Sequence, residues 1–176
     1  GNNPSTGWFV DELNVEVGPP PVFNNPELFE SGWGDWYADF GVWEIGTPTK
    51  GPGAAYSGSK CAAPGLTATP ALSLDSRLIS PPVTIPEAGQ NPRLRFWHWY
   101  DVTSYGSFAQ VEIKVGTAGW TAISPSYNGT SNGKWARPYL DLAAYAGETV
   151  QFALHYGSGN NPSTGWFVDE LNVEVG

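Results

Sequence analysis

Acidic side chains beside apolar segments are the residues of this chain best suited to chemistry. Asp169 shares the alternation of Leu171 and Val173, so we expect it to point toward the core, where an isolated carboxylate is costly. Asp101 ends an aromatic segment in a comparable way, and Glu30 lies near the start of the same unit. If Glu30, Asp101 and Asp169 converge, they offer oxygen ligands of the kind that Ca²⁺ prefers. The alternative is that Asp169 caps loop amides and Glu30 is merely solvated.

Aromatic side chains offer a second kind of site. Trp97 and Trp99 share one face of an alternating segment, so one set of rings in this segment lines the core and the other lies outside. Exposed Trp rings can stack on sugars, which would make this a carbohydrate-binding module. The alternative is packing, because large aromatics dominate buried area. The same two interpretations apply to a second aromatic stretch, which comprises Trp33, Trp36, Tyr37, Phe40 and Trp43.

Catalytic groups are scarce. His98 and His155 are the only histidines, and because both lie in predicted strands we expect hydrogen-bonded structural roles instead of a triad or a zinc site. Cys61 stands alone, which excludes an intrachain disulfide and favours a passive thiol or an intermolecular cross-link. Asp75 is predicted to be a simple partner of Arg77. We predict no enzyme, although a converging pair of carboxylates stays open.

Composition narrows the class of protein. The 176 residues carry 8 Lys+Arg against 17 Asp+Glu, a net charge of −9, which argues against a nucleic-acid partner. No apolar run is long enough to cross a bilayer, so we expect no membrane insertion in this segment. The 22 Gly and 16 Pro interrupt long helices, and 14% aromatic residues suit short strands joined by turns.

Alternation of apolar and polar residues predicts the main strands. The matching segments are 94–100, 110–115, 149–156 and 167–175. Residues 46–65 and 122–133 are predicted to be long surface loops, and no segment favours a helix. The expected fold is therefore all-β, an antiparallel two-sheet sandwich.

An internal repeat defines the domain organisation. Residues 1–18, with the sequence GNNPSTGWFVDELNVEVG, recur letter for letter as residues 159–176, a period of 159 − 1 = 158 residues. We read residues 1–18 as the terminal strand of a preceding repeat or a strand-exchange segment, 19–22 as a Pro-rich linker and 23–176 as one domain. A tandem array is favoured over strand exchange, and pairing of residues 1–18 within the chain, between chains or not at all stays open. An exchanged strand would pair through Trp8, Phe9, Val10, Leu13, Val15 and Val17.

Six short motifs carry a resemblance to a known family. In order they are Phe29-Glu30, Ala55-Tyr56-Ser57-Gly58, Ser76-Arg77-Leu78-Ile79-Ser80-Pro81, Leu94-Arg95-Phe96-Trp97-His98-Trp99-Tyr100-Asp101, Tyr139-Leu140-Asp141-Leu142 with Tyr145-Ala146-Gly147, and Gly165-Trp166-Phe167-Val168-Asp169-Glu170-Leu171. This order resembles the MAM-like jelly rolls of bacterial surface proteins, the cleaved-adhesin or choice-of-anchor J domains. It covers nearly all of residues 27–175.

The resemblance implies an extracellular, non-catalytic, concanavalin-like jelly roll. Members of the family often bind Ca²⁺ and occur in adhesins, secreted proteases and cell-wall proteins. This sequence departs from the pattern at Glu170, where the family commonly has a second Asp, and in the turn 116–119, which lacks a frequent acidic residue.

These observations predict a structural or adhesive repeat unit of a secreted or cell-surface protein. Calcium would stiffen the unit, and its partners would be neighbouring repeats or identical subunits, assembled into an array or a filament through the terminal strand. The alternative is a carbohydrate-binding module of a larger secreted enzyme, with a glycan as partner. An enzymatic function ranks third.

Overall fold

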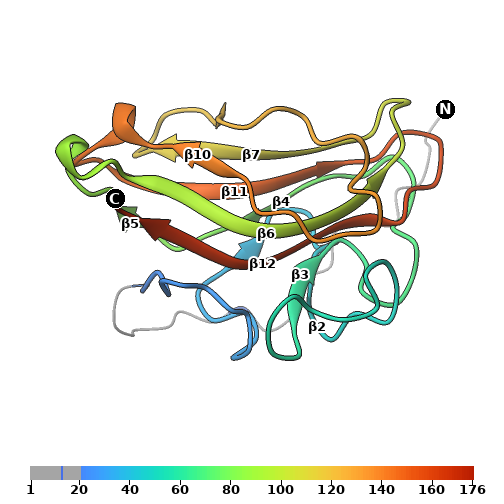
Figure 1. Ribbon diagram of the computed structural model, residues 1–176. Helices are drawn as coiled ribbons and strands as arrows, with labels where there is room; N and C mark the ends of the chain where they lie inside the picture. Colours follow the sequence, from blue (N-terminus) through green and yellow to red (C-terminus); the bar gives the residue numbers. More distant parts are fainter. Residues whose placement is uncertain (1–12, 14–20) are drawn as a thin grey trace, which may run out of the picture.

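The computed structural model describes residue 13 and residues 21–176. Two six-stranded antiparallel sheets pack face to face in this part of the chain, as the sequence predicts. Figure 1 shows the long strands β6, β7, β11 and β12 aligned along the length of the molecule. The predicted jelly-roll type of β-sandwich is confirmed. The predicted N-terminal strand lies outside the described residues, apart from the exposed Leu13.

The first sheet, here called the β11 sheet, has the order β1-β4-β11-β7-β8, with β5 also paired to β11. Its strands are β1 (Tyr37–Ala38), β4 (Asp75–Ile79), β5 (Val83–Thr84), β7 (Phe108–Val115), β8 (Thr121–Ala122) and β11 (Thr149–Gly157). The second, the β12 sheet, has the order β10-β6-β12-β3-β2, with β9 paired to β6. Its strands are β2 (Glu44–Gly46), β3 (Cys61–Ala63), β6 (Arg93–Val102), β9 (Gly129–Thr130), β10 (Tyr139–Asp141) and β12 (Gly165–Glu174).

The four longest predicted strands are confirmed as β6, β7, β11 and β12, each within two residues of its expected ends. Alternation finds these strands because each buries one face against the other sheet. Helical structure in residues 21–176 is limited to two 3-10 turns, η1 (Ala88–Gln90) and η2 (Ala143–Tyr145). No helix in that range is long and apolar enough to span a membrane.

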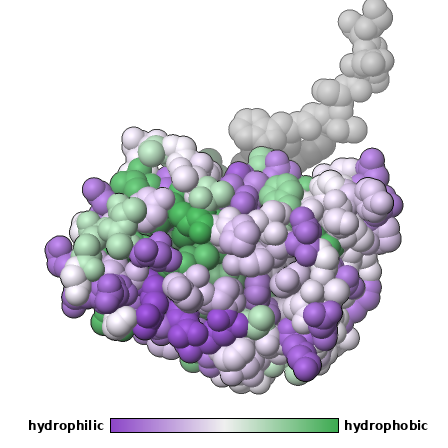
Figure 2. All heavy atoms as spheres, turned by 45° about the horizontal axis from the view of Figure 1, so that its top comes forward, coloured by the Kyte–Doolittle hydropathy of each residue, from purple (hydrophilic) through white to green (hydrophobic). Residues whose placement is uncertain are grey.

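The sandwich core lies between the two sheets. It is rich in aromatic and branched side chains, including Phe96, Phe152, Leu154, Trp166 and Val168. Trp166 is fully buried and meets Trp43 edge to face, with 6.0 Å between ring centroids. On the face drawn in Figure 2, hydrophobic residues form a limited area bordered by hydrophilic ones. The fully buried rings therefore fill the space between the two sheets.

A bulge in β12 changes which side chains face the core. The register to β6 shifts between Asp169 and Asn172, and Glu170 adopts a positive φ of 48°. Val168 and Leu171 both face the inter-sheet core, whereas Phe167 packs in a separate cluster. The expectation that Asp169 points inward with Leu171 is therefore wrong, because one extra residue in the bulge reverses the alternation.

The predicted loop 46–65 covers the outer face of the β12 sheet, and it contains the short strand β3. Figure 1 shows this part of the chain folded beneath β12. Under it lies a second apolar cluster made of Cys61, Ala63, Leu66, Trp99 and Phe167. The loop passes so close that a Cβ added at Gly51 would lie 2.4 Å from the Phe167 ring.

Candidate functional site

Charged side chains gather on the outer face of the β11 sheet, on neighbouring strands. The ladder places Arg77 of β4 opposite His155 of β11, and β7 runs along the other side of β11. His155 lies between two carboxylates: its Nε2 is 2.6 Å from Asp75 Oδ1 and its Nδ1 is 3.0 Å from Glu112 Oε1. Arg77 Nε donates to Glu112 Oε2 at 2.6 Å. We call this group the polar cluster; it consists of Asp39, Asp75, Arg77, Glu112 and His155.

The polar cluster is buried at its centre and open at one end. His155 and Glu112 are buried, whereas the Asp75 side chain is 74% exposed. Burial disfavours the charge on Arg77, but the hydrogen bond and charge of Glu112, with Asp39 and Asp75, outweigh it and raise the pKa of the guanidinium. The strands thus hold an exposed carboxylate in place through a buried histidine.

The prediction that Asp75 pairs with Arg77 is wrong. Arg77 contacts Glu112 and, at 3.6 Å, Asp39, while Asp75 contacts His155. The pairing depends on the order of strands in the sheet, which brings β4 and β7 to either side of β11. Sequence spacing within β4 does not contain that information.

A surface hollow adjoins the exposed end of the polar cluster. It has a volume of about 350 Å³ and is lined by Phe40, Val42, Ser73, Leu74 and Asp75. The Phe40 ring is 69% exposed. The hollow therefore combines an apolar wall with an oriented carboxylate, a combination typical of small-ligand sites.

The second aromatic stretch is divided between packing and surface. Trp36 and Trp43 are buried, and their indole N–H groups donate to Glu27 and to the Ser76 carbonyl. Three others are exposed: Trp33, Tyr37 and Phe40. The packing interpretation is right for the first two residues, and the surface interpretation for the other three.

Two of the three predicted calcium ligands meet at one loop. Asp169 is completely buried and accepts the Ser57 amide at 2.9 Å and the Glu170 amide at 2.8 Å. Glu30 accepts the amides of Ser59 and Lys60, each at 2.8 Å. Both carboxylates therefore hold the segment 57–60 through its backbone.

Burial and hydrogen bonding act in opposite directions on these two acids. Burial raises the pKa of Asp169 to about 6, although its amide partners oppose the shift. The amides of Ser59 and Lys60 lower the pKa of Glu30. Glu30 is thus well satisfied as an anion, whereas Asp169 is a buried carboxylate that has no cationic partner within the described residues.

Asp101 lies apart from the other two predicted ligands. In the ladder between β6 and β12, Asp101 lies opposite Gly165, whereas Asp169 lies opposite Trp97, four residues earlier on β6. Asp101 accepts a hydrogen bond from the Thr164 hydroxyl at 2.5 Å. Within the described residues, no three His, Cys, Asp or Glu side chains are grouped to hold a metal ion. Glu30 and Asp169 have suitable oxygen chemistry, but protein donors already occupy both oxygens of each carboxylate. The Lys60 ammonium also donates to the Glu30 carbonyl at 2.8 Å. Calcium binding stays a prediction, and it now depends on these two carboxylates.

The predicted binding residues Trp97 and Trp99 lie on the covered face of the β12 sheet. Trp99 is only 8% exposed and packs edge to face on Phe167. Trp97 stacks on Tyr56 with ring centroids 3.8 Å apart. The guanidinium carbon of Arg137 lies over the Trp97 ring, 5.8 Å from its centroid. Trp99 is therefore a packing residue, whereas the half-buried Trp97 with Tyr56 stays a predicted contact for a ligand.

The remaining candidate groups have structural surroundings. His98 Nδ1 accepts the Trp166 indole N–H at 3.3 Å, and burial lowers the pKa of His98 to about 4. Both histidines are hydrogen-bonded within the sandwich, as the sequence predicts, and a purely structural role stays a prediction. Burial, with the charges of Asp169 and Glu30, raises the pKa of the Cys61 thiol to about 12, as expected for a passive thiol.

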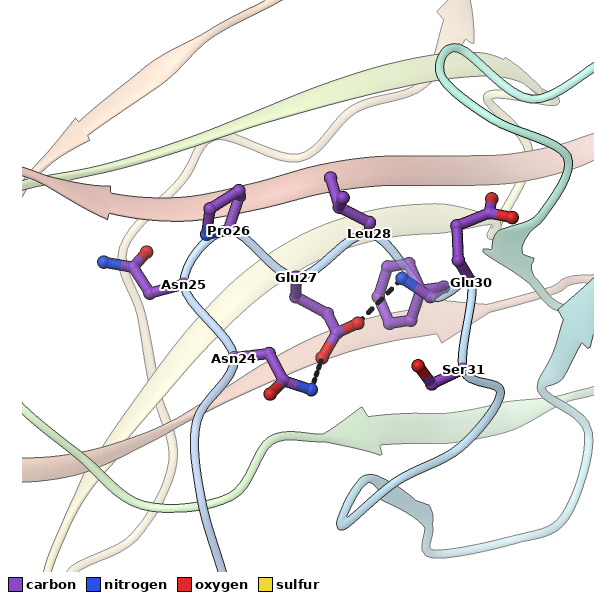
Figure 3. A pocket seen from close by; sticks show the side chains of 8 residues that line it. Asn24, Asn25, Pro26, Glu27, Leu28, Glu30 and Ser31 are labelled. Atoms are coloured by element: carbon purple, nitrogen blue, oxygen red, sulfur yellow. Dashed lines mark hydrogen bonds between the residues drawn. The ribbon is translucent and has the colours of Figure 1, made fainter.

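A second pocket, of about 370 Å³, lies along residues 24–31. Figure 3 shows Glu27 in this pocket, with its carboxylate turned toward Asn24. Its carboxylate accepts Asn24 Nδ2 at 3.1 Å, the Phe29 amide at 2.7 Å and Trp36 Nε1 at 3.1 Å. Because protein donors occupy both oxygens, Glu27 anchors this segment and leaves little for a ligand.

Comparisons with known proteins support the jelly-roll type of fold. No protein-family model matches the chain. Bacillopeptidase F of Bacillus subtilis is 29% identical over 165 residues, which cover 92% of this chain but 11% of that protein. The chain therefore spans about a tenth of the length of this relative.

Two solved structures share the fold. A carbohydrate-binding module, TmCBM61, solved with beta-1,4-galactotriose, has a TM-score of 0.62 at 14% identity, covering 90% of this chain and 100% of that chain. The K2 cleaved adhesin domain of Lys-gingipain has a TM-score of 0.57 at 19% identity, covering 85% and 98%. At these identities the likeness shows the β-sandwich fold alone.

Proposed function

We propose that this domain is a non-catalytic adhesive module of a larger exported protein, and that it binds glycans at the hollow beside Asp75. The observation that carries the proposal is the exposed Asp75 carboxylate, fixed by His155 at 2.6 Å and adjoining the exposed ring of Phe40. The apolar face of a sugar ring would stack on Phe40, and neighbouring hydroxyls would donate to Asp75. Fixing the carboxylate beforehand reduces the entropy lost on binding.

The contacts of His155 support a binding role over catalysis. In the described part of the chain both of its ring nitrogens face carboxylates, so neither is placed to activate a hydroxyl or thiol. Asp75 and Glu112 lie on opposite sides of the imidazole and do not face a common substrate. The similarity to a carbohydrate-binding module and an adhesin domain fits the same role, as does the relation to a much longer peptidase.

A repeat unit that builds an array is a second part of the proposal. It rests on the identity of residues 1–18 with 159–176. In this proposal residues 1–18 would be the end of a preceding domain, directly before the start of this one. The partners would then be neighbouring repeats, and the location extracellular or at the cell surface.

Calcium at Glu30 and Asp169 is a third, separable part. A bound ion would supply positive charge to a buried carboxylate and would stabilise the folded state by mass action. We expect EDTA to lower the melting midpoint and added Ca²⁺ to restore it, with Mg²⁺ as the control ion. Identical melting curves in EDTA and in millimolar Ca²⁺ would remove calcium from the proposal without touching the glycan site.

The glycan site is tested by binding to a glycan array and, as a single probe, to beta-1,4-galactotriose. We expect Phe40→Ala and Asp75→Asn each to weaken the binding of any captured glycan by roughly tenfold or more, about 1.4 kcal/mol. Tyr139→Ala and Glu148→Gln are matched controls, because both residues are exposed and neither belongs to the polar cluster or lines the hollow. The site is wrong if no glycan binds, or if binding survives both substitutions.

A further inference from the structure

β12 is an interior strand whose sequence exists twice in the chain. It pairs with β6 on one side and with β3 on the other. Every residue of β12 has an identical counterpart 158 positions earlier, because residues 159–176 repeat 1–18. Whatever recognises β12 therefore recognises the copy equally well. We call the space that β12 fills the β12 slot.

The β12 slot is built by residues that lie outside both copies. Trp43 packs on Trp166 at its centre, and the Ser57 amide binds Asp169 on its outer side. At its far end, three arginines surround Glu174: Arg93 at 3.0 Å, Arg95 at 3.3 Å and Arg137 at 3.7 Å. The copy has Trp8, Asp11 and Glu16 at the equivalent positions. Packing, hydrogen bonds and ion pairs would all be reproduced.

The start of the described domain already lies against the end of β12. Glu27 and Leu171 exchange both backbone hydrogen bonds, at 2.7 and 3.0 Å, in an antiparallel bridge. The Asn25 side chain binds both backbone groups of Val173 at 2.8 Å. In Figure 1 the blue segment that follows residue 21 lies below β12. The first and last segments of the domain are therefore antiparallel neighbours.

Antiparallel neighbours are the strands that a hairpin connection can join. With the copy in the slot, Leu13 would face Glu27 and Val15 would face Asn25, and residues 16–24 would form the connecting loop. A loop of this length spans neighbouring strands easily, since each residue reaches roughly 3.3 Å. The arrangement is a circular permutation of the domain, which neighbouring termini commonly permit.

We propose that residues 1–18 bind the β12 slot of their own chain, in exchange with residues 159–176. The two arrangements bury the same side chains and differ only in their connecting loop, 16–24 or 158–164. When residues 1–18 fill the slot, the displaced 159–176 segment is free to complete the slot of a following domain. A row of such domains would thus be joined by strands that can pair either within their own domain or with the following one.

The single cysteine makes occupancy of the slot measurable. Ala62 pairs with Val168, so in the antiparallel ladder Cys61 faces Asp169, whose counterpart is Asp11. Residues facing each other in such a ladder are close enough for a disulfide. Asp11→Cys in the full chain is therefore expected to form an intramolecular disulfide with Cys61 under mild oxidation, detected by peptide mass mapping at monomer mass. Adding Trp166→Ala should raise the yield, because it weakens only the competing copy.

Matched variants decide the result of the cross-linking. Glu16→Cys places the thiol in the same segment 1–18. In the β12 slot, however, residue 16 would lie opposite Arg93, so it should form no disulfide with Cys61. Asp169→Cys is the positive control, because residue 169 faces Cys61 in the described structure and its disulfide would show that the geometry permits this bond. The proposal fails if Asp11→Cys gives no bond while Asp169→Cys does, and equally if Asp11→Cys links only in disulfide dimers, since exchange would then be between chains.

Thermal unfolding of the full chain gives an independent test. Trp166 is fully buried, so its loss without replacement should lower the melting midpoint by roughly 10 °C. We expect Trp8→Ala to have no effect, Trp166→Ala a small one, and the double variant the full loss, because either copy alone can complete the domain. A full loss in Trp166→Ala that Trp8→Ala does not increase would overturn the proposal.

Discussion

The outer faces of the two sheets differ in what lies over them. The β12 sheet carries aromatic and apolar residues outward, and the segment around 46–66 covers them, so that Trp99 and Phe167 are buried. The β11 sheet carries the polar cluster outward and exposes Asp75 beside the hollow. Large aromatic rings alone are therefore a poor guide to a binding surface in this fold. The open face, whose polar groups are already oriented, is the better candidate.

The largest effect should come from the covered face. Phe167→Ala removes a fully buried ring and leaves a cavity under the loop, so we expect a loss of about 3 to 5 kcal/mol in the free energy of unfolding. Phe40→Ala, on the open face, should change stability by no more than about 0.5 kcal/mol. Urea unfolding of both variants measures the contrast. Equal losses would mean that the open face is structural too.

The next effect tests whether the polar cluster is held rigidly. Glu112→Ala leaves Arg77 and His155 without their shared partner in a largely buried place, so we expect a loss of about 2 to 3 kcal/mol in stability. Glycan binding should weaken as well, because His155 would no longer be fixed and Asp75 would lose its orientation. Glu148→Ala, an exposed carboxylate, is the control. Unchanged stability after Glu112→Ala would show that solvent replaces this carboxylate.

The sequence predicts some features of this molecule well and others not at all, for physical reasons. Strands β6, β7, β11 and β12 follow from alternation because each is long and buries one face. The bulge at Asp169 has no such signal, since the alternation of 167–175 continues through it in the sequence. The polar cluster joins Asp75, Glu112 and His155, which only the order of strands brings together. Asp101 shows that similar sequence surroundings do not imply a shared site. Like Asp169 it follows an aromatic segment, yet it lies four residues along β6 from the partner of Asp169.

The smallest effect concerns the pH dependence of the covered face. Burial raises the pKa of Asp169 to about 6, above its unfolded value, so the folded state binds this proton more tightly. The contribution of Asp169 to the free energy of unfolding therefore increases by on the order of 1 kcal/mol as the pH falls from 7 to 5. His98 acts in the opposite direction over the same range, because burial lowers its pKa to about 4 and the unfolded state gains the proton.

The contribution of Asp169 is isolated by comparing the wild type with Asp169→Asn at each pH, since the His98 contribution is common to both. We expect the variant to lose stability relative to the wild type as the pH falls from 7 to 5. Adding calcium provides a further check. An ion bound to Asp169 would lower the pKa of this carboxyl and so abolish the pH dependence of the stability difference between the wild type and Asp169→Asn. A difference that is independent of pH in EDTA would show that Asp169 is already ionised and that the covering loop admits more water than its burial indicates.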